Sequence, residues 1–257
     1  MKIAAQLYNC RDYTKTPADI EATLRRVKAI GFDTIQISGF GPCDPDLLAG
    51  WIRETGLEVC LTHTPWQRLA DPAELKKVIA EHRKMNCPVI GLGARPGDVF
   101  PNSPEGWTRF IRKANEITGQ IKGEGLDFSY HNHDFEFEKW NGVTAIDRLI
   151  EECPGMLFTL DVFWVQAGGG NPLKYIKKLE GRIRIIHFKD YRIVNRNRQF
   201  AEIGRGVLDW DEIIPLCEST GIYCAAIEQD SDWLIDPFES LAMSREFLVS
   251  SPHAWAS

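Results

Sequence analysis

The feature of this sequence that most constrains its fold is a regular alternation, in which a short apolar run is followed by a longer amphipathic stretch eight times. Runs of this length are typical of buried strands, and the stretches between them have the apolar spacing of helices. We expect strands at residues 3–7, 34–37, 58–61, 89–92, 127–130, 157–160, 184–187 and 224–227. Strands separated by helices run parallel with right-handed crossovers, so eight units predict a closed (β/α)8 barrel, the TIM barrel.

The helix starts can be predicted because a capping side chain stands directly before a proline at six positions. Such a side chain accepts hydrogen bonds from the first free backbone N–H groups, and proline suits the first helical position. The six pairs are Thr16-Pro17, Asp44-Pro45, Asp71-Pro72, Ser103-Pro104, Asn171-Pro172 and Asp236-Pro237. Helices are expected to end at Gly31, Gly56 and Gly221, just before the next strand.

A doubly wound open sheet is the alternative architecture, and it would bring a glycine-rich phosphate loop after the first strand. Residues 8–13, which follow the first expected strand, contain no glycine. The length of 257 residues is ordinary for one α/β barrel, which needs about 250 residues. Since no linker or low-complexity tract interrupts the chain, we expect one barrel domain over residues 1–257.

Composition excludes several classes of partner. A net charge of -6 gives no general attraction to the phosphates of a nucleic acid, and the one basic cluster, residues 192–198, is expected to be a solvated loop. No apolar run approaches the ~20 residues of a membrane span, and the first residues lack the pattern of a signal peptide. The seven cysteines form no C-x-x-C pair, which fits a reduced, cytoplasmic location. Homo- or hetero-oligomers remain open.

Polar residues gather where the expected strands end, which is where a barrel places its functional groups. The segments are Thr62-His63-Thr64-Pro65-Trp66, Tyr130-His131-Asn132-His133-Asp134-Phe135-Glu136, Asp161-Val162-Phe163-Trp164, His187-Phe188-Lys189-Asp190 and Glu228-Gln229-Asp230. Four of the six histidines fall in these segments, which a random scatter would rarely produce. We therefore expect one functional site at this end of the barrel.

Carboxylates and imidazoles from the last four strands are expected to converge at the barrel mouth. Carboxylates brought together there would repel and raise each other's pKa unless a cation held them. A mixed oxygen and nitrogen set such as Glu136, Asp161, His187 and Glu228 suits one divalent ion, with Mn²⁺ preferred and Mg²⁺, Co²⁺ or Zn²⁺ as alternatives. The set contains no thiolate, which argues against a structural zinc site.

These segments resemble the xylose isomerase-like TIM barrel superfamily of sugar (phosphate) isomerases and epimerases, which also includes inosose dehydratases and endonuclease IV. The resemblance is carried by the spacing from Asp161 to His187-Phe188-Lys189-Asp190, by the segment from Glu202 to Trp210, and by Ile227-Glu228. It spans the barrel and is strongest over residues 130–228. It implies one metal held by Glu, Asp, His and Glu from strands five to eight.

Two departures from the family pattern bear on the site. The family usually supplies its first metal glutamate within strand five, where this chain has His131-Asn132-His133, so the first ligand stays open between Glu136 and a strand-five histidine. The family often has Asp-x-x-His in strand six, where this chain has Trp164; an indole cannot coordinate a metal, so Trp164 is expected to stack on a sugar ring.

The version of strand five found here, Tyr-His-Asn-His-x-Phe-Glu-Phe, resembles a subgroup associated with keto-sugar elimination. This subgroup includes relatives of inosose dehydratase and enzymes that cleave 3-keto-glycosides. The resemblance therefore implies a lyase as an alternative to a sugar (phosphate) isomerase or epimerase acting on a small carbohydrate.

Isomerisation, epimerisation and elimination all begin with removal of a proton next to a carbonyl. A metal at the carbonyl oxygen stabilises the charge that develops, and positioned side chains move the protons. We expect His131 or His133, together with Glu228, to transfer protons. Lys189 either donates to a substrate oxygen or forms an ion pair with Asp190 or Glu202.

Other residues are candidates for substrate contacts. His63 and Trp66 are expected to line the substrate wall, and the segment that contains Glu202 and Arg205 could present backbone amides and a guanidinium to an anionic group such as a phosphate. Two other function classes fit the sequence less well. An endonuclease IV-like hydrolase would need more histidines and a basic groove, and a non-catalytic barrel subunit would not need four convergent ionisable groups.

Overall fold

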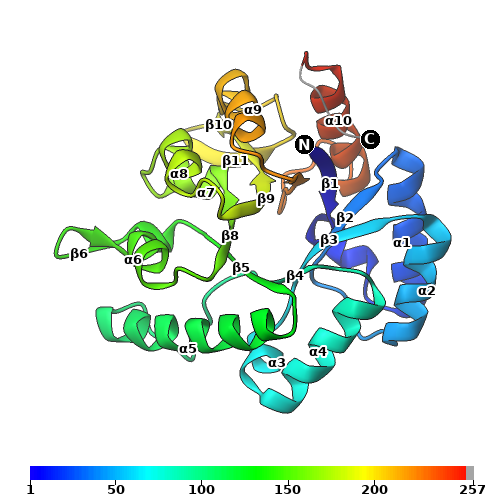
Figure 1. Cartoon of the computed structure of the whole chain (residues 1–257). Helices are drawn as coiled ribbons and strands as arrows, with labels where there is room; N and C mark the ends of the chain where they lie inside the picture. Colours follow the sequence, from blue (N-terminus) through cyan, green and yellow to red (C-terminus); the bar gives the residue numbers. More distant parts are fainter. Residues whose placement is uncertain (253–257) are drawn as a thin grey trace.

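The computed structural model describes residues 1–252 and has a closed barrel of parallel strands ringed by helices (Figure 1). Around the barrel the strands follow the order β1-β12-β9-β8-β5-β4-β3-β2. Their bounds are β1 (Lys2–Gln6), β2 (Thr34–Ile37), β3 (Glu58–His63), β4 (Val89–Leu92), β5 (Asp127–His131), β8 (Leu157–Asp161), β9 (Ile183–Phe188) and β12 (Cys224–Ile227). The expected barrel and its eight strands are confirmed. The expected domain runs on to residue 257, and residues 253–257 lie outside the described part.

The helices begin where the capping pairs predict. Each of the six capping side chains accepts a hydrogen bond from a backbone N–H in the first turn of its helix. The helices are α1 (Pro17–Ile30), α2 (Pro45–Thr55), α3 (Trp66–Ala70), α4 (Pro72–Lys84), α5 (Pro104–Gly123), α6 (Ala145–Glu152), α7 (Val162–Ala167), α8 (Pro172–Lys178), α9 (Trp210–Ser219) and α10 (Pro237–Ser250). Helices α1 and α2 end at glycines with φ of 105° and 63°, a left-handed conformation that other residues rarely adopt.

The apolar side chains form two layers. The larger cluster lies between the helices and the barrel strands. A smaller cluster fills the interior of the barrel, because its members come from strands on opposite sides: Ala4, Cys60, Leu61, Val89, Ile185, Cys224 and Ala226. The interior is therefore packed with side chains, and functional groups are confined to the mouth at the carboxyl ends of the strands.

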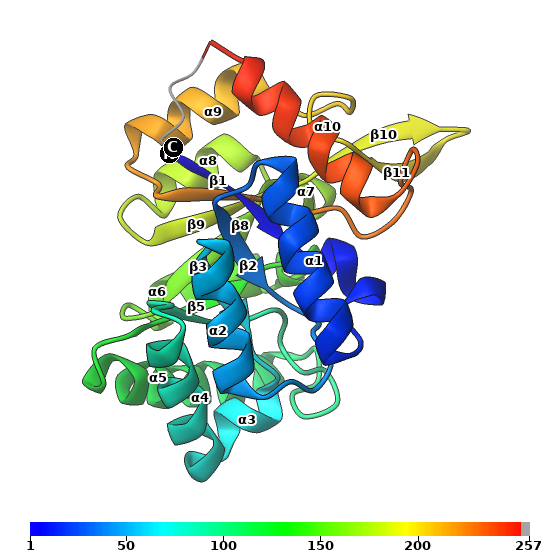
Figure 2. The same cartoon turned by 90° about the vertical axis from the view of Figure 1, so that its right-hand side faces the viewer.

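A β-hairpin follows strand β9, where the sequence predicted a solvated loop. Strands β10 (Asp190–Val194) and β11 (Asn197–Ala201) pair antiparallel and project from the barrel (Figure 2). The turn residues Asn195 and Arg196 have φ of 49° and 67°, as a tight hairpin turn requires. The loop prediction was wrong because this turn lacks the glycine that usually marks it. The basic side chains of Arg196 and Arg198 are exposed, as expected.

Shorter elements complete the fold. They are the 3-10 helices η1 (Leu7–Tyr13) and η2 (Phe135–Phe137), and the pair of strands β6 (Lys139–Trp140) and β7 (Val143–Thr144). Helix η2 matters for the site, since it redirects the chain just after β5. None of the helices formed by residues 1–252 combines the length and the apolar character needed to cross a lipid bilayer.

Candidate metal centre and substrate cavity

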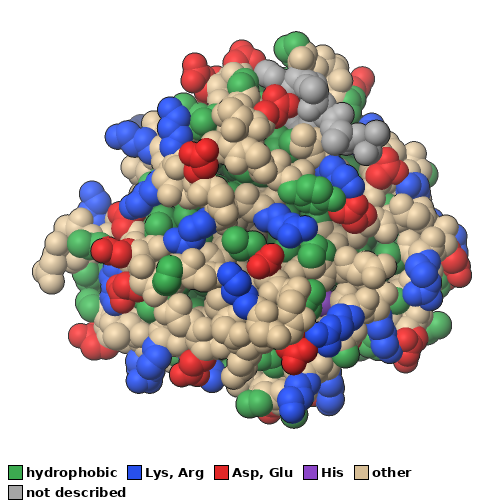
Figure 3. Space-filling model, in the orientation of Figure 1, with side chains coloured by type: hydrophobic (Ala, Val, Ile, Leu, Met, Phe, Trp, Pro, Cys, Tyr) green, Lys and Arg blue, Asp and Glu red, His purple; other side chains and the backbone are tan. Residues whose placement is uncertain are grey.

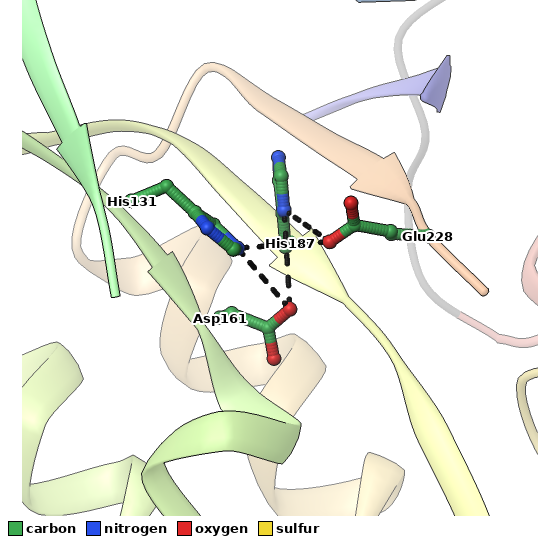
Figure 4. Close-up of side chains that lie close together, drawn as sticks. All are labelled: His131, Asp161, His187 and Glu228. Carbon is green, nitrogen blue, oxygen red and sulfur yellow. Dashed lines mark hydrogen bonds and ion pairs between the residues drawn. The ribbon is translucent and has the colours of Figure 1, made fainter. Parts of the chain in front are cut away.

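Four ionisable side chains converge at the mouth of the barrel from four neighbouring strands (Figure 4). His131 ends β5, Asp161 ends β8, His187 lies in β9 and Glu228 directly follows β12. One possible ligand atom from each lies within 4.8 Å of the others, and all four side chains are buried. We call these four residues the metal group.

The spacing within the metal group suits a single ion. His187 Nδ1 lies 2.8 Å from Glu228 Oε2, and His131 Nε2 lies 3.4 Å from Asp161 Oδ2. The longer separations, from His131 to Glu228 and from His187 to Asp161, are 3.6 Å and 3.9 Å. Ligands bound at about 2.0–2.2 Å from one ion lie roughly 3–3.5 Å from one another, so these atoms can surround it with little movement.

In both His131 and His187, the ring nitrogen that faces away from the metal group donates a hydrogen bond. The Nδ1 of His131 donates to the Gly93 carbonyl oxygen and the Nε2 of His187 donates to Gln36 Oε1, both at 2.8 Å. A neutral imidazole carries one proton, so the nitrogens that face the metal group are then bare. His187 Nδ1 and the Glu228 carboxylate would therefore meet without a proton between them, which favours a cation at this point.

The carboxylates of the group are also oriented from outside. Gln6 Nε2 donates to Glu228 Oε1 at 3.1 Å, and the Trp164 backbone N–H donates to Asp161 Oδ1 at 2.9 Å, where Asp161 caps helix α7. One oxygen of each carboxylate is thus occupied, and the other turns toward the two histidines. The donor set of two imidazoles and two carboxylates fits a divalent metal ion.

Electrostatics keep most of the group in the protonation states that bind metal. Burial lowers the pKa of His187. Burial would raise the pKa of Glu228, but Lys189 and His187 hold it well below its usual range. For His131, burial opposes protonation, yet the hydrogen bond that its protonated Nε2 donates to Asp161 and the charge of Glu228 raise its pKa. Metal binding must therefore displace a proton chiefly from His131.

Glu136 does not join the metal group, which corrects one of the two expectations for the first ligand. Its Oε1 accepts from the Tyr130 hydroxyl at 2.5 Å and its Oε2 accepts from the His133 backbone N–H at 2.8 Å. The physical reason is that β5 ends at His131 and the chain then turns into η2, which directs Glu136 away from the barrel axis. Burial raises the pKa of Glu136 to about 7.

A cavity of about 540 Å³ opens over the metal group. His131 and Glu228 form part of its floor, and four of the other predicted residues line it: His63, Trp66, His133 and Lys189. Tyr8 and Arg11 from η1 also line it, and neither was expected from the sequence. On the face drawn in Figure 3, basic and acidic side chains are interspersed, with no broad area of one sign.

Lys189 is buried beside the group and is paired with Asp230. Its Nζ lies 2.5 Å from Asp230 Oδ2 and 3.6 Å from Glu228 Oε2, under the rings of Phe200 and Trp164 at 4.8 Å and 5.0 Å. Burial would lower the pKa of Lys189, but the surrounding carboxylates raise it. Lys189 is therefore a charged donor at the cavity wall.

The two ion-pair partners expected for Lys189 are engaged elsewhere. Asp190 accepts hydrogen bonds from the backbone N–H groups of the following loop at residues 204–208. Glu202 accepts from Ser240 Oγ and from the Leu234 backbone N–H. These two expectations were wrong, because both carboxylates fold back onto the loops that surround them.

The segment with Glu202 and Arg205, which was expected to bind an anionic group, does not line the cavity. The backbone N–H groups of Gly204, Gly206, Val207 and Leu208 donate to Asp190. Glu202 is buried against α10, and Arg205 is exposed outside the cavity. Trp164 is half-buried and its ring lies 5.2 Å from that of His133, behind the lining residues. A stacking contact between Trp164 and a sugar would therefore need His133 or Lys189 to move aside.

Gln6, Gln36 and Asp230 support the site but were assigned no role from the sequence. Gln6 and Gln36 bond the metal group, and Asp230 bonds Lys189. A signal did exist, since both glutamines are polar residues inside otherwise apolar strands. Buried polar side chains nearly always have a hydrogen-bond partner, so such residues point to a site.

Comparisons with known proteins agree with the fold. Residues 24–247 match the family described as Xylose isomerase-like TIM barrel. An inosose dehydratase from Bacillus thuringiensis (strain Al Hakam) is 27% identical over 177 residues, which cover 58% of this chain and 57% of that protein. The chain thus spans a little over half the length of the curated relatives that it matches.

Two solved structures share the fold over nearly their whole length. A sugar phosphate isomerase/epimerase from Parabacteroides distasonis superposes with a TM-score of 0.77 at 20% identity, covering 98% of both chains. The probable 3-DHS dehydratase AsbF from Bacillus anthracis superposes with a TM-score of 0.72 at 15% identity, covering 97% of this chain and 99% of that one. At these identities the likeness concerns the fold alone.

Proposed function

The chain belongs to the Xylose isomerase-like TIM barrel family, and we propose that it is a metal-dependent enzyme that removes a proton next to the carbonyl of a sugar-like substrate. The observation that carries the proposal is the metal group on the floor of a cavity of about 540 Å³. That volume suits a small molecule, since ligand pockets typically enclose about 300–1,000 Å³.

His131, Asp161, His187 and Glu228 would hold the ion, which we propose to be Mn²⁺, with Mg²⁺, Co²⁺ or Zn²⁺ as alternatives. A bound divalent ion supplies Lewis acidity to the carbonyl and neighbouring hydroxyl oxygens of the substrate. Hydrogen bonds to Gly93 and Gln36 fix the orientations of the His131 and His187 rings, and the hydrogen bond from Gln6 fixes the Glu228 carboxylate. Such bonds hold ligands in the orientation that metal binding requires.

His133 is the residue that we assign to proton removal. It lines the cavity, its Nδ1 is buried without a partner, and burial together with the nearby His131 lowers its pKa to about 2. The ring is therefore neutral, and the negative charge that develops on the bound substrate must raise this pKa before Nδ1 takes up the proton. Glu228 was also a candidate for this step, but Gln6 and the metal group occupy its two oxygens.

Lys189 is proposed to act as the hydrogen-bond donor to a substrate oxygen. Its ammonium group lies at the cavity wall and its charge is maintained by Glu228, Asp161 and Asp230. His63 Nε2 is buried without a partner on another part of the wall. The cavity thus holds a neutral acceptor, His133, and a charged donor, Lys189, which suits an epimerase or isomerase, in which one group removes a proton and another returns it.

Elimination from a keto-sugar, an inosose or a 3-keto-glycoside is the second candidate. It is supported by the similarity to inosose dehydratases and by Lys189, which can protonate a leaving hydroxyl or alkoxide. Both candidates share the first proton removal, so one experiment tests them together.

The test combines metal analysis with solvent exchange. We expect about one divalent ion per chain, and deuterium incorporation from D₂O next to the carbonyl of at least one member of a panel of keto-sugars, inososes and 3-keto-glycosides. Asp161→Asn should lose both metal and exchange, whereas the same substitution at the exposed Asp211 of α9 should retain both. His133→Ala should keep the metal and lose the exchange.

Each outcome has a clear meaning. An epimer or isomer as product supports the first candidate, and a dehydrated or cleaved product supports the second. A protein that binds no metal and exchanges no proton with any substrate of the panel would contradict the proposal and leave a non-catalytic barrel.

A further inference from the structure

A second cavity of about 440 Å³ lies beside the first, at the carboxyl ends of β2 and β3 and against α2 and α4. Five residues line both cavities: Ser38, Gly39, His63, Thr64 and Pro65. The two spaces therefore share a wall, and the second one lies directly beside the candidate active site.

The second cavity is predominantly apolar and carries no unbalanced charge. Ile37, Phe40, Leu48 and Met85 supply much of its surface. Its charged pair, Arg68 and Glu81, is joined by two parallel hydrogen bonds of 2.9 Å, so each charge neutralises the other.

Its histidine, His82, is neutral and bonded on both sides. His82 Nδ1 lies 2.7 Å from the Val78 carbonyl oxygen and Nε2 lies 2.8 Å from Thr62 Oγ1, while burial lowers the pKa of the ring to about 4. A charged group entering this cavity would find no free partner, and an unpaired buried charge is strongly unfavourable. An uncharged occupant therefore fits this cavity best.

The shared wall has free hydrogen-bonding capacity. Ser38 is 2% exposed, and its hydroxyl is buried without a partner. His63 Nε2, on the same wall, is also buried without a partner. Buried polar atoms are nearly always satisfied, so both are suited to a ligand oxygen that lies between the two cavities.

We propose that the second cavity is a subsite for an uncharged, apolar substituent attached through an oxygen to the sugar-like part of the substrate. This inference rests on the proposed function in one respect, namely that the first cavity holds the sugar. It narrows the substrate to a two-part molecule, such as a glycoside with an aromatic or aliphatic aglycone, rather than a free or phosphorylated sugar.

Cys43 provides a readout that depends on neither metal nor turnover. It lines the second cavity and is half-buried, whereas the other six cysteines are buried. Iodoacetamide should therefore alkylate Cys43 selectively, and Cys43→Ser should abolish the labelling. We expect benzyl alcohol to slow the alkylation of Cys43 in a saturable way. The charged analogues benzoate and benzylamine should need concentrations at least about tenfold higher for the same protection of Cys43.

A pair of neighbouring leucines supplies the matched variants. Leu48 lines the cavity, whereas Leu47 on the same helix is 52% exposed and points away from it. Leu48→Arg should abolish protection by benzyl alcohol, and Leu47→Arg should leave it intact. Saturable protection that is lost only in Leu48→Arg supports the subsite, and failure of benzyl alcohol to protect Cys43 in the wild-type protein overturns it.

The link to the sugar is tested with the methyl and phenyl β-glycosides of 3-keto-glucose. We expect the phenyl glycoside to protect Cys43 at concentrations at least about tenfold lower than the methyl glycoside, since a buried phenyl ring contributes more than 1.4 kcal/mol. Equal protection by the two would overturn the two-part substrate. Deuterium exchange tests the proposed function separately. If no substrate exchanges deuterium but benzyl alcohol still protects Cys43, the proposed activity is contradicted and the apolar subsite is still supported.

Discussion

At the scale of single residues, the end of β5 decides which side chain joins the metal group. Side chains alternate along a strand, so Ser129 and His131 face the barrel axis while Tyr130 packs toward α5. The Tyr130 hydroxyl bonds Glu136, and the two residues form a buried support behind His131 and His133. A histidine therefore occupies the place that the family usually gives to a glutamate.

This arrangement predicts opposite effects for two substitutions. His131→Ala should reduce metal affinity by at least about tenfold, since it removes one proposed ligand. Glu136→Ala should leave the metal stoichiometry unchanged and lower the free energy of unfolding by about 1–3 kcal/mol, because the Tyr130 hydroxyl and the His133 N–H lose their buried acceptor. Elemental analysis and urea unfolding measure the two effects. Loss of metal from Glu136→Ala with full retention in His131→Ala would reverse the assignment.

His82 predicts a pH dependence of stability that is independent of the metal. Burial lowers the pKa of His82 to about 4 in the folded chain, against about 6.5 when unfolded. Between these values the unfolded chain binds the additional proton, so the stabilisation is complete above about pH 6.5 and is lost as the pH falls toward 4. The difference is on the order of 3 kcal/mol.

The measurement is the free energy of unfolding from pH 7.5 to 4.5 for the wild-type protein and for His82→Gln, which cannot take up a proton. The wild-type protein should lose its advantage over the variant as the pH falls. Parallel curves for the two proteins would show that His82 does not titrate as proposed.

Much of the residue-level site could be predicted from the sequence, and the remainder depended on loop conformation. Asp161, His187 and Glu228 stand at strand ends, and strand ends meet at the barrel mouth whatever the loops do. Glu136 lies five residues beyond β5, where the short helix η2 fixes its direction through contacts that no local pattern reveals. The same limit applies to Glu202, whose partner Ser240 lies far along the chain.

At the scale of elements, one buried carboxylate organises the segment between β11 and α9. Asp190 accepts hydrogen bonds from the backbone of residues 204–208 and from the Trp210 indole. The loop approaches so closely that a Cβ on Gly206 would lie 2.0 Å from Asp190 Oδ1. Because Lys189 precedes Asp190, the same anchor sets the position of the ammonium group at the cavity wall.

Gly206→Ala should therefore loosen this segment. We expect a loss of about 1–3 kcal/mol in stability and an increase of at least about tenfold in amide hydrogen exchange over residues 204–208. Gly119→Ala is the matched control, because a Cβ there meets nothing within 4 Å in the interior of α5. It should instead add about 0.5–1 kcal/mol. Unchanged exchange in Gly206→Ala would contradict the role given to Asp190.

The element-level predictions failed only where the sequence lacked the usual markers. Six capping pairs and the glycines after α1 and α2 were correct because each reflects a local requirement of the backbone. The β10–β11 hairpin was missed because its turn uses Asn195 and Arg196 at positive φ instead of glycine. Its stability comes from Phe200, which packs on Phe163 and over Lys189, and these are contacts between distant parts of the chain.

At the scale of the whole molecule, the metal group ties together four neighbouring strands. Metal binding to the folded state alone must stabilise the entire barrel, by about 2.7 kcal/mol at a free metal concentration of 100 times Kd. For a chain of this size the melting temperature should rise by roughly 5–10 °C on addition of Mn²⁺ to chelator-treated protein.

Differential scanning calorimetry with and without chelator measures this rise, and Asp161→Asn should not show it. An equal rise in Asp161→Asn would indicate that the ion binds elsewhere. A rise that survives only in the presence of another divalent ion would instead identify the metal that the group prefers.

The metal group and the second cavity are formed by different segments of the chain. The side chains of the metal group come from residues 131–228, whereas the residues that line the second cavity come from residues 37–85. Mutations of the residues that line only the second cavity therefore leave the metal group in place, and the same chemistry can be offered to new molecules by altering residues within the segment 37–85. Such a barrel can acquire a different substrate during evolution without passing through an inactive ancestor.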